Sequence, residues 1–378
     1  MNWMKRHLIY INMVWASMLL LGSCTSESGT GTPDVTPVVP SKPTNNTETA
    51  VSQDEIKFQI TTDENQEAVT REATLYNNLS TLQAELSREG GAGNFFHVDA
   101  FYDGETSKYI DSHVFYFSGG SGVWTFADNT GSRLHYYWPP SQTLTYLNFL
   151  AYYPEVLTHT GVSSVTYSSD KAPVINCKLP LTNNQTFDGS PRINMREFIY
   201  AFEERKNKTE HAESGVTLDF MHPFAAVYFR IGQAKQLMTL NSIILRRIFY
   251  QGASSYNSVA TPKTSWTPSG SSTDFTMSIG KQMGTTMQKG SEYGPFIVMP
   301  QAFTGRAGLS DIKIAINYTP YSGSETTTSD ISLGHDSWIP GKKYIYTLDL
   351  GQDEGNINVS VSVVDWDDQG NNTQINVD

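Results

Sequence analysis

Apolar and polar residues alternate with a period of two through most of the chain, and this spacing places successive side chains on opposite faces of a β-strand. The clearest runs are Ile56–Ile60, Ile312–Tyr318 and Ile357–Val363. Each run has one apolar and one wetter face, as in antiparallel sheets that are solvated on one side. Two such sheets stacked face to face make a sandwich, so the pattern predicts an all-β fold of the β-sandwich type.

Two segments depart from this alternation. The run from Leu144 to Tyr153 is largely apolar on both faces, which predicts a strand in the middle of a sheet. The leucines Leu75, Leu79, Leu82 and Leu86 follow helical spacing, and a glycine pair comes after them. This spacing predicts a short amphipathic helix near the start of the folded region.

The amino terminus has the organisation of a secretory signal peptide. Lys5 and Arg6 precede an apolar stretch, and small residues close that stretch before Cys24. The stretch is too short to cross a hydrocarbon core of ~30 Å as a helix. The segment Leu21–Cys24 resembles the bacterial lipobox, which implies that residues 1–23 are removed and that Cys24 carries lipid chains such as palmitate. We therefore expect a lipoprotein of the cell outer membrane.

Residues 24–53 are mostly polar and contain several prolines, so we expect a flexible tether that holds the folded part away from the membrane. The remaining chain is long enough for two domains of roughly 150 residues each. The charge run Glu203–His211 is typical of a solvated loop, and alternating apolar residues resume after it. We therefore predict one β-sandwich over residues 54–211 and a second over residues 212–378.

Charge and cysteine content narrow the classes of function. The net charge of −12 opposes binding to a phosphate backbone and argues against a nucleic-acid partner. The chain has two cysteines, and a lipidated Cys24 leaves Cys177 without an intramolecular partner. No disulfide is expected, and Cys177 is interpreted as a small buried hydrophobic residue. Stability then has to come from core packing.

The search for catalytic motifs gives no candidate. The sequence has no Gly-x-Ser-x-Gly elbow, no His-Glu-x-x-His pair and no phosphate-binding glycine loop. The histidines lack the spacing of metal ligands, so no metal, cofactor or catalytic residue is expected. The sequence therefore does not predict an enzyme.

Several segments, taken in order along the chain, resemble those of fimbrillin-like pilus subunits and adhesins. They are Trp138–Pro139, Phe149–Pro154, Leu218–Ile231, Phe296–Gln301, Trp338–Tyr346 and Val363–Trp366. Each also has a plain structural interpretation, and His222 in particular is interpreted as a packed core histidine. The resemblance implies two tandem transthyretin-like β-sandwiches in a fimbrial subunit or adhesin that mediates cell adhesion. Its partners would be other fimbrial subunits and a host protein or glycan.

The resemblance further implies assembly by donor-strand exchange, in which a protease removes the first strand and a segment of a neighbouring subunit replaces it. In this chain the removable strand would contain Ile56, Phe58 and Ile60. Family members are cut after an arginine in the loop that follows. Arg71 is the first candidate for this cleavage, and Arg88 is the second.

The end of the chain supplies a candidate donor strand. Ile375 and Val377 alternate with polar residues, as they would in a short strand. The same segment equally fits an edge strand of its own sheet, because two apolar anchors bury little surface. The sequence leaves both interpretations open.

Two other functions stay open. One is a surface glycan-binding lipoprotein, because tyrosines and tryptophans on sandwich loops can stack on sugar rings; a flat, exposed row of aromatic side chains would favour it. The other is a glycoside hydrolase, which needs two carboxylates ~5 to 10 Å apart in one cleft. Folding can create such a pair without any sequence motif.

Overall fold

The computed structural model describes residues 54–62, 79–87, 94–117, 123–140, 145–158, 160–168, 170–180, 197–234, 237–283, 292–305, 310–350, 357–365 and 373–375. Within these ranges the regular secondary structure is almost entirely β-strand, with two short helices, α1 (Leu79–Glu85) and α2 (Lys208–His211). The all-β prediction is confirmed, and α1 confirms the predicted helix from Leu79 onward. Neither of these described helices has the length and apolar character that a membrane span requires.

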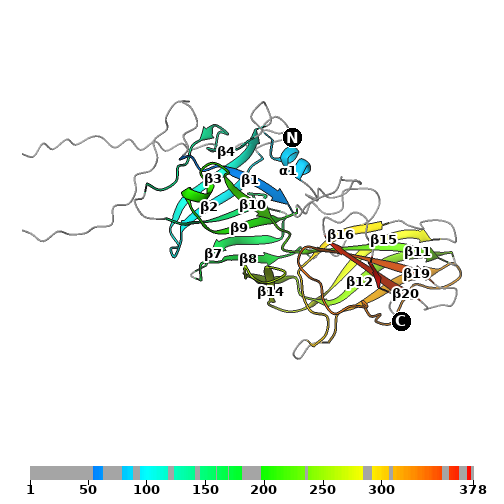
Figure 1. Ribbon diagram of the computed structural model, residues 1–378. Helices are drawn as coiled ribbons and strands as arrows, with labels where there is room; N and C mark the ends of the chain where they lie inside the picture. The colour runs from blue at the N-terminus through cyan, green and yellow to red at the C-terminus, as the bar shows by residue number, and fades with distance from the viewer. Residues whose placement is uncertain are drawn as a thin grey trace, which may run out of the picture. The chain divides into compact units, whose positions relative to one another are not determined.

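The first sheet curls until its two end strands meet. Its described strands, in spatial order, are β10 (Val216–Phe220), β1 (Phe58–Thr62), β4 (Val123–Ala127), β3 (Lys108–Phe117), β2 (Phe96–Tyr102), β6 (Leu147–Tyr153) and β9 (Ile199–Lys206), with β5 (Arg133–Leu134) beside β4 (Figure 1). Tyr200 on β9 exchanges two backbone hydrogen bonds, of 3.1 and 2.7 Å, with Met221 just after β10. The concave face is therefore enclosed, and apolar residues from all of these strands except the short β5 share one buried core there.

A second, smaller sheet packs on the outer face of β6 and β9. Its described strands, in spatial order, are β14 (Thr264–Pro268), β13 (Gln251–Tyr256), β8 (Pro173–Lys178) and β7 (Val162–Tyr167). Leu150 and Phe202 point outward from the first sheet and meet Ile175 of the second. Both faces of β6 are thus covered, which confirms the central strand predicted from its two apolar faces.

Cys177 lies in the core between these two sheets. Its side chain is buried and is not part of a disulfide. Burial raises the pKa of its thiol to about 12, so the thiolate is disfavoured. The interpretation of Cys177 as a small buried hydrophobic residue is confirmed.

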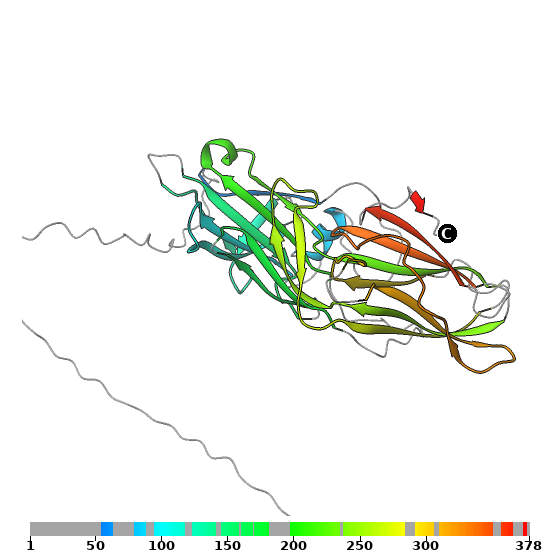
Figure 2. The same ribbon diagram turned by 90° about the horizontal axis from the view of Figure 1, so that it is seen from below.

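The later part of the chain forms a β-sandwich of two facing sheets. One sheet contains β16 (Glu292–Val298), β11 (Ala225–Ala234), β19 (Lys342–Leu350), β20 (Ile357–Asp365) and β21 (Thr373–Ile375). The other contains β15 (Thr273–Met283), β12 (Met238–Ile248), β17 (Lys313–Pro320) and β18 (Thr326–Thr327). Phe229 and Tyr346 from the first layer pack with Ile243 and Ile316 from the second in a single core. Figure 2 shows the layer of β19 and β20 in orange and red.

The predicted domain boundary near residue 212 is crossed by strand pairing. β10 follows this position but pairs in parallel with β1 along five residues, from Phe58↔Val216 to Thr62↔Phe220. β13 also follows it and pairs with β8, so strands far apart in sequence share one sheet. The division at residue 212 stays a prediction.

The charge run Glu203–His211 differs from its prediction as a solvated loop. It completes β9, where Glu203 pairs with Phe149 of β6, and then forms α2. Asn207 caps that helix by accepting a hydrogen bond of 3.1 Å from the backbone N–H of Glu210. The prediction of a loop was wrong because cross-strand pairing and a helix cap outweigh the preference of charged side chains for irregular structure.

Candidate functional site

β1 contributes side chains to the middle of the first core. Ile56, Phe58 and Ile60 have exposed fractions of 2%, 6% and 4%, while Gln59 between them is exposed. The alternation predicted for this strand is therefore present, with its apolar face inward. The Phe58 ring lies 5.1 Å, centroid to centroid, from the ring of Phe126 in an edge-on arrangement that aromatic pairs favour.

The backbone of β1 fills a position between two strands of the same sheet. It forms a parallel ladder with β10 along five residues, and its described ladder with β4 joins Phe58 to Trp124. Gly215, just before β10, has a φ of +80° and lies so close to β1 that an added Cβ would stand 3.1 Å from the carbonyl oxygen of Lys57. Removing β1 would leave β10 with unpaired N–H and C=O groups and an open row of pockets.

A polar contact holds the start of the strand. The Glu55 carboxylate lies 2.6 Å from His135 Nδ1, and its side chain is only 7% exposed. The backbone N–H of Ile56 donates a hydrogen bond of 2.8 Å to the carbonyl of Tyr136. These contacts fix the register of β1 at its amino end.

Of the other predicted site residues, only Ile375 lies within the part of the chain that the structure describes. Arg71, Arg88, Cys24 and Val377 lie outside the described residues. Ile375 ends β21, a three-residue strand at the edge of its sheet, and pairs with Val361 of β20.

The segment before Arg88 is built into the first core. Leu82 and Leu86 of this segment are fully buried. The backbone carbonyl of Leu86 accepts a hydrogen bond of 3.0 Å from Tyr116 on β3. A cut after Arg88 would therefore separate more of the core from the fold than a cut after Arg71.

The Trp338–Tyr346 segment owes its composition to a buried hydrogen-bond chain. Trp338 Nε1 donates to the hydroxyl of Tyr346 over 3.0 Å, and that hydroxyl lies 2.5 Å from His335 Nε2. His335 Nδ1 donates in turn to the carbonyl of Ser337 at 2.9 Å. Burial lowers the pKa of His335 to about 4, so the imidazole is neutral and its Nε2 accepts a hydrogen bond from the Tyr346 hydroxyl. These residues serve packing.

His222 and the pair His97 and His113 lie in different surroundings. His222 lies 2.7 Å from the carboxylate of Glu197, with both side chains buried, which agrees with its interpretation as a packed histidine.

His97 and His113, 16 residues apart, are brought together at the outer face of β2 and β3. Burial opposes charge on His97, but its hydrogen bond with Asp99 and the nearby Glu155 carboxylate outweigh burial and raise the pKa of His97 to about 9. The sequence contains one possible signal of this contact. His97-x-Asp99 is followed by the reversed pattern Asp111-x-His113, and an antiparallel hairpin can pair the two histidines with each other and the two aspartates with each other.

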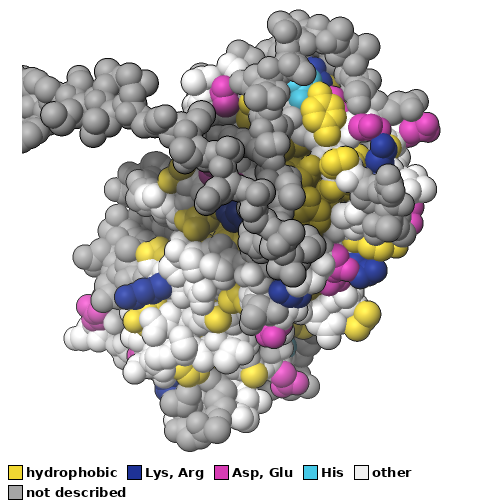
Figure 3. Space-filling view, turned by 90° about the vertical axis from the view of Figure 1, so that its left-hand side faces the viewer, with side chains coloured by type: hydrophobic (Ala, Val, Ile, Leu, Met, Phe, Trp, Pro, Cys, Tyr) yellow, Lys and Arg dark blue, Asp and Glu magenta, His cyan; other side chains and the backbone are white. Residues whose placement is uncertain are grey.

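The basic side chains visible on one face of the molecule are scattered. On the face shown in Figure 3, the lysine and arginine side chains of the described residues lie singly among acidic and apolar ones, without a continuous basic stripe there.

Comparison with known proteins assigns the family. The sequence profile of the fimbrillin-like family matches residues 94–366, which is well over half of the chain. The chain belongs to the fimbrillin-like family. The matched range of this fimbrillin-like chain begins after β1 and ends before β21, so both segments considered for strand exchange lie outside it. No curated protein matches the sequence.

Several solved structures are similar to this fimbrillin-like chain at low identity. A fimbrial protein from Bacteroides vulgatus is 15% identical, with a TM-score of 0.50 over 83% of this chain and 99% of that one. The C-terminally truncated tip fimbrial protein Mfa3 from Porphyromonas gingivalis is 12% identical, with a TM-score of 0.40 over 72% and 94% of the two chains. A fimbrial assembly protein from Parabacteroides distasonis is 10% identical, with a TM-score of 0.38 over 85% and 98%. The first of these carries the fold assignment.

Proposed function

We propose that the protein is a lipid-anchored fimbrial subunit or adhesin of the cell surface, and that it assembles by exchange of β1 for a donor strand of a neighbouring subunit. The proposed role is structural and adhesive rather than catalytic. The observation that carries the proposal is the position of β1: its Phe58 and Ile60, with Ile56 just before it, fill the first core, yet it comes from the extreme start of the described chain. Membership of the fimbrillin-like family supports the same function.

The geometry of β1 suits replacement by another extended segment. Its ladder with β10 would offer an incoming strand five residues of backbone pairing. The pockets that hold Ile56, Phe58 and Ile60 would accept alternate side chains of that segment, which is how β-strand addition combines affinity with specificity. The leaving and entering strands would thus obey the same period-two pattern.

Arg71 is the preferred cleavage site because of what each cut would release. Cleavage after Arg71, in the connection between β1 and α1, would detach β1 and leave α1 with the core. Cleavage after Arg88 would also detach Leu82 and Leu86, both fully buried. Loss of large buried side chains costs roughly 2 to 5 kcal/mol each. The remaining domain is therefore expected to tolerate the first cut better.

β21 is the proposed donor segment. Three residue pairs join it to β20, Val361↔Ile375, Ser362↔Gln374 and Val363↔Thr373, so its release would break few contacts among the described residues. A strand at the edge of a sheet can separate without splitting the sheet. With Ile375 and Val377 as its apolar anchors, the segment could enter the groove of a neighbouring subunit.

Mass spectrometry of the mature protein taken from the cell surface tests the proposal. The expected result is a lipid-modified Cys24 in the precursor form and, in assembled material, a chain that begins at Glu72. An assembled chain that retains Ile56 to Ile60 would exclude removal of β1. An unmodified Cys24 would exclude the lipid anchor.

A further inference from the structure

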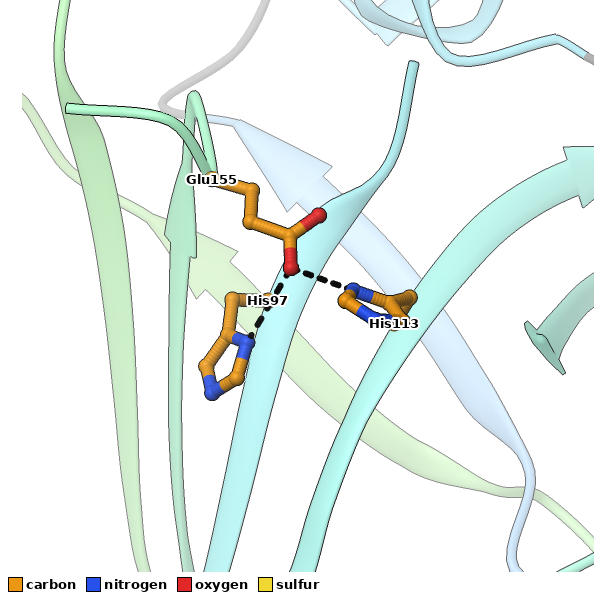
Figure 4. Close-up of side chains that lie close together, drawn as sticks. All are labelled: His97, His113 and Glu155. Carbon is orange, nitrogen blue, oxygen red and sulfur yellow. Dashed lines mark ion pairs between the residues drawn. The ribbon is translucent and has the colours of Figure 1, made fainter. Parts of the chain in front are cut away.

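Three titratable side chains from separate elements converge on the outer face of the first sheet. His97 on β2 and His113 on β3 are direct partners in the antiparallel ladder, and Glu155 follows β6. Figure 4 shows both imidazoles turned toward the Glu155 carboxylate. His97 Nδ1 lies 3.6 Å from Glu155 Oε1, and His113 Nδ1 lies against the same oxygen. One ligand atom from each residue falls within 4.8 Å of the others.

The remaining nitrogen of each ring is held by an oxygen acceptor. His97 Nε2 lies 2.8 Å from Asp99 Oδ1, and His113 Nε2 lies 2.8 Å from the side-chain oxygen of Asn129. Because these oxygens accept hydrogen bonds, each Nε2 carries a proton. In the metal-free protein the raised pKa of His97 means that its Nδ1 also carries a proton, directed at Glu155. A cation that displaces this proton would meet the Nδ1 lone pairs of both rings beside the Glu155 oxygen. Histidines that bind metals are oriented in the same way, with the second nitrogen donating to a carboxylate or amide oxygen.

A second group of possible ligands, His97, Asp99 and Asp111, shares one histidine with this set. The Lys108 ammonium lies 2.7 Å from Asp99 Oδ1 and 3.4 Å from Asp111 Oδ2. The lysine already neutralises these two carboxylates, and Asp99 is also engaged by His97 Nε2. The group that contains His113 and Glu155 is therefore the better donor set.

We propose that His97 Nδ1, His113 Nδ1 and the Glu155 carboxylate form a binding site for a divalent transition-metal cation of the zinc type. Two imidazoles and one carboxylate are donors that Zn²⁺ accepts, whereas Ca²⁺ and Mg²⁺ take oxygen ligands. Ligand atoms ~2.0 to 2.1 Å from zinc in a tetrahedron lie about 3.3 Å apart, and the 3.6 Å between His97 and Glu155 is close to that value. The His113 and Glu155 side chains are 23% and 25% exposed, so a cation can reach them, and water or an external ligand would complete the shell.

Titration of the purified, chelator-treated protein with Zn²⁺ alone, followed by calorimetry, tests the site. We expect one ion per chain, and a Kd at least ~10-fold weaker in His113→Asn and in Glu155→Gln. Asp111→Asn tests the competing donor set and should keep the native affinity. His211→Asn replaces a histidine of α2 outside the cluster and is the matched control. Zn²⁺ should also raise the Tm of the native protein, because a ligand bound to the folded state stabilises it.

Thermal unfolding without metal establishes that each variant is folded, and Glu155→Gln carries the test if His113→Asn does not fold. The proposal is overturned if the native protein does not bind Zn²⁺ or if Glu155→Gln binds it as tightly as the native protein. An equal loss of affinity in Asp111→Asn and Glu155→Gln would also overturn it, since the binding set would then include the carboxylates that Lys108 neutralises.

Discussion

The ring of Phe58 stands edge-on to the ring of Phe149, with the centroids 5.7 Å apart and the planes at 85°. Phe58 is on β1 and Phe149 is on β6, four strands away along the curled sheet. The contact therefore crosses the interior of the core, so the first strand fills the centre of that core. Any strand that replaces β1 has to supply an apolar side chain at the same point.

Phe58→Ala should lower the free energy of unfolding by roughly 3 to 5 kcal/mol, because it removes a buried ring and leaves a cavity. Chemical denaturation of the uncleaved protein measures the change. Gln59→Ala is the matched control on the exposed face of the same strand. It removes one side-chain hydrogen bond, of 2.6 Å to the carbonyl of Ser214, and should cost about 0.5 to 1.5 kcal/mol. Equal losses in the two variants would show that β1 is not part of the core.

His335 predicts a pH dependence of stability. Its folded-state pKa of about 4 lies below the ordinary value of 6.5, so the unfolded chain binds the proton first as the pH falls. The stabilisation that the neutral His335 side chain contributes is therefore fully present when the pH is above its ordinary pKa of 6.5. It is lost as the pH falls toward the folded-state pKa of about 4. In His335→Gln, the loss of stability between about pH 7.5 and about pH 4.5 should be smaller than in the native protein. A loss of the same size in both would contradict the burial of a neutral imidazole.

Cys24→Ala should abolish lipid attachment and leave uncleaved precursor, because the thiol is the proposed acceptor of the lipid. Metabolic labelling with a fatty-acid probe measures attachment, and Cys177→Ala is the matched control because its thiol is buried in the core. Label on the Cys24→Ala protein equal to that on the native protein would refute the lipobox interpretation.

Truncation after Asp368 should leave both parts of the fold intact while removing the donor segment. β21 pairs with β20 through three residue pairs at the edge of its sheet, so its loss should change the unfolding midpoint little. Polymers formed after protease treatment should disappear. If the truncated protein still forms them, the donor lies elsewhere in the chain.

The sequence predicted the fold class and the orientation of many strands, because period two depends only on neighbouring residues. Ile314 and Ile316, for instance, face the core as their spacing requires. Periodicity does not report which strand lies beside which. The parallel pairing of β10 with β1, and the pairing of β13 with β8, join segments more than 70 residues apart and were not predicted.

The histidine cluster escaped prediction for the same reason. His97 and His113 are adjacent only because β2 and β3 pair in that register, and Glu155 joins them only because β6 lies on the other side of β2. The spacing of ligands along a chain is informative when they share a helix or a loop. When three strands supply them, the register has to be known first.

Formation of sodium-dodecyl-sulfate-resistant polymers after treatment with an arginine-specific protease tests the central claim most directly. The native protein should give a ladder of oligomers on a gel once β1 has been released. Arg71→Ala should give no ladder under the same treatment, and the matched control Arg88→Ala should give the native ladder. A ladder from Arg71→Ala equal to that of the native protein, or none from the native protein after complete cleavage at Arg71, would contradict assembly by exchange of β1.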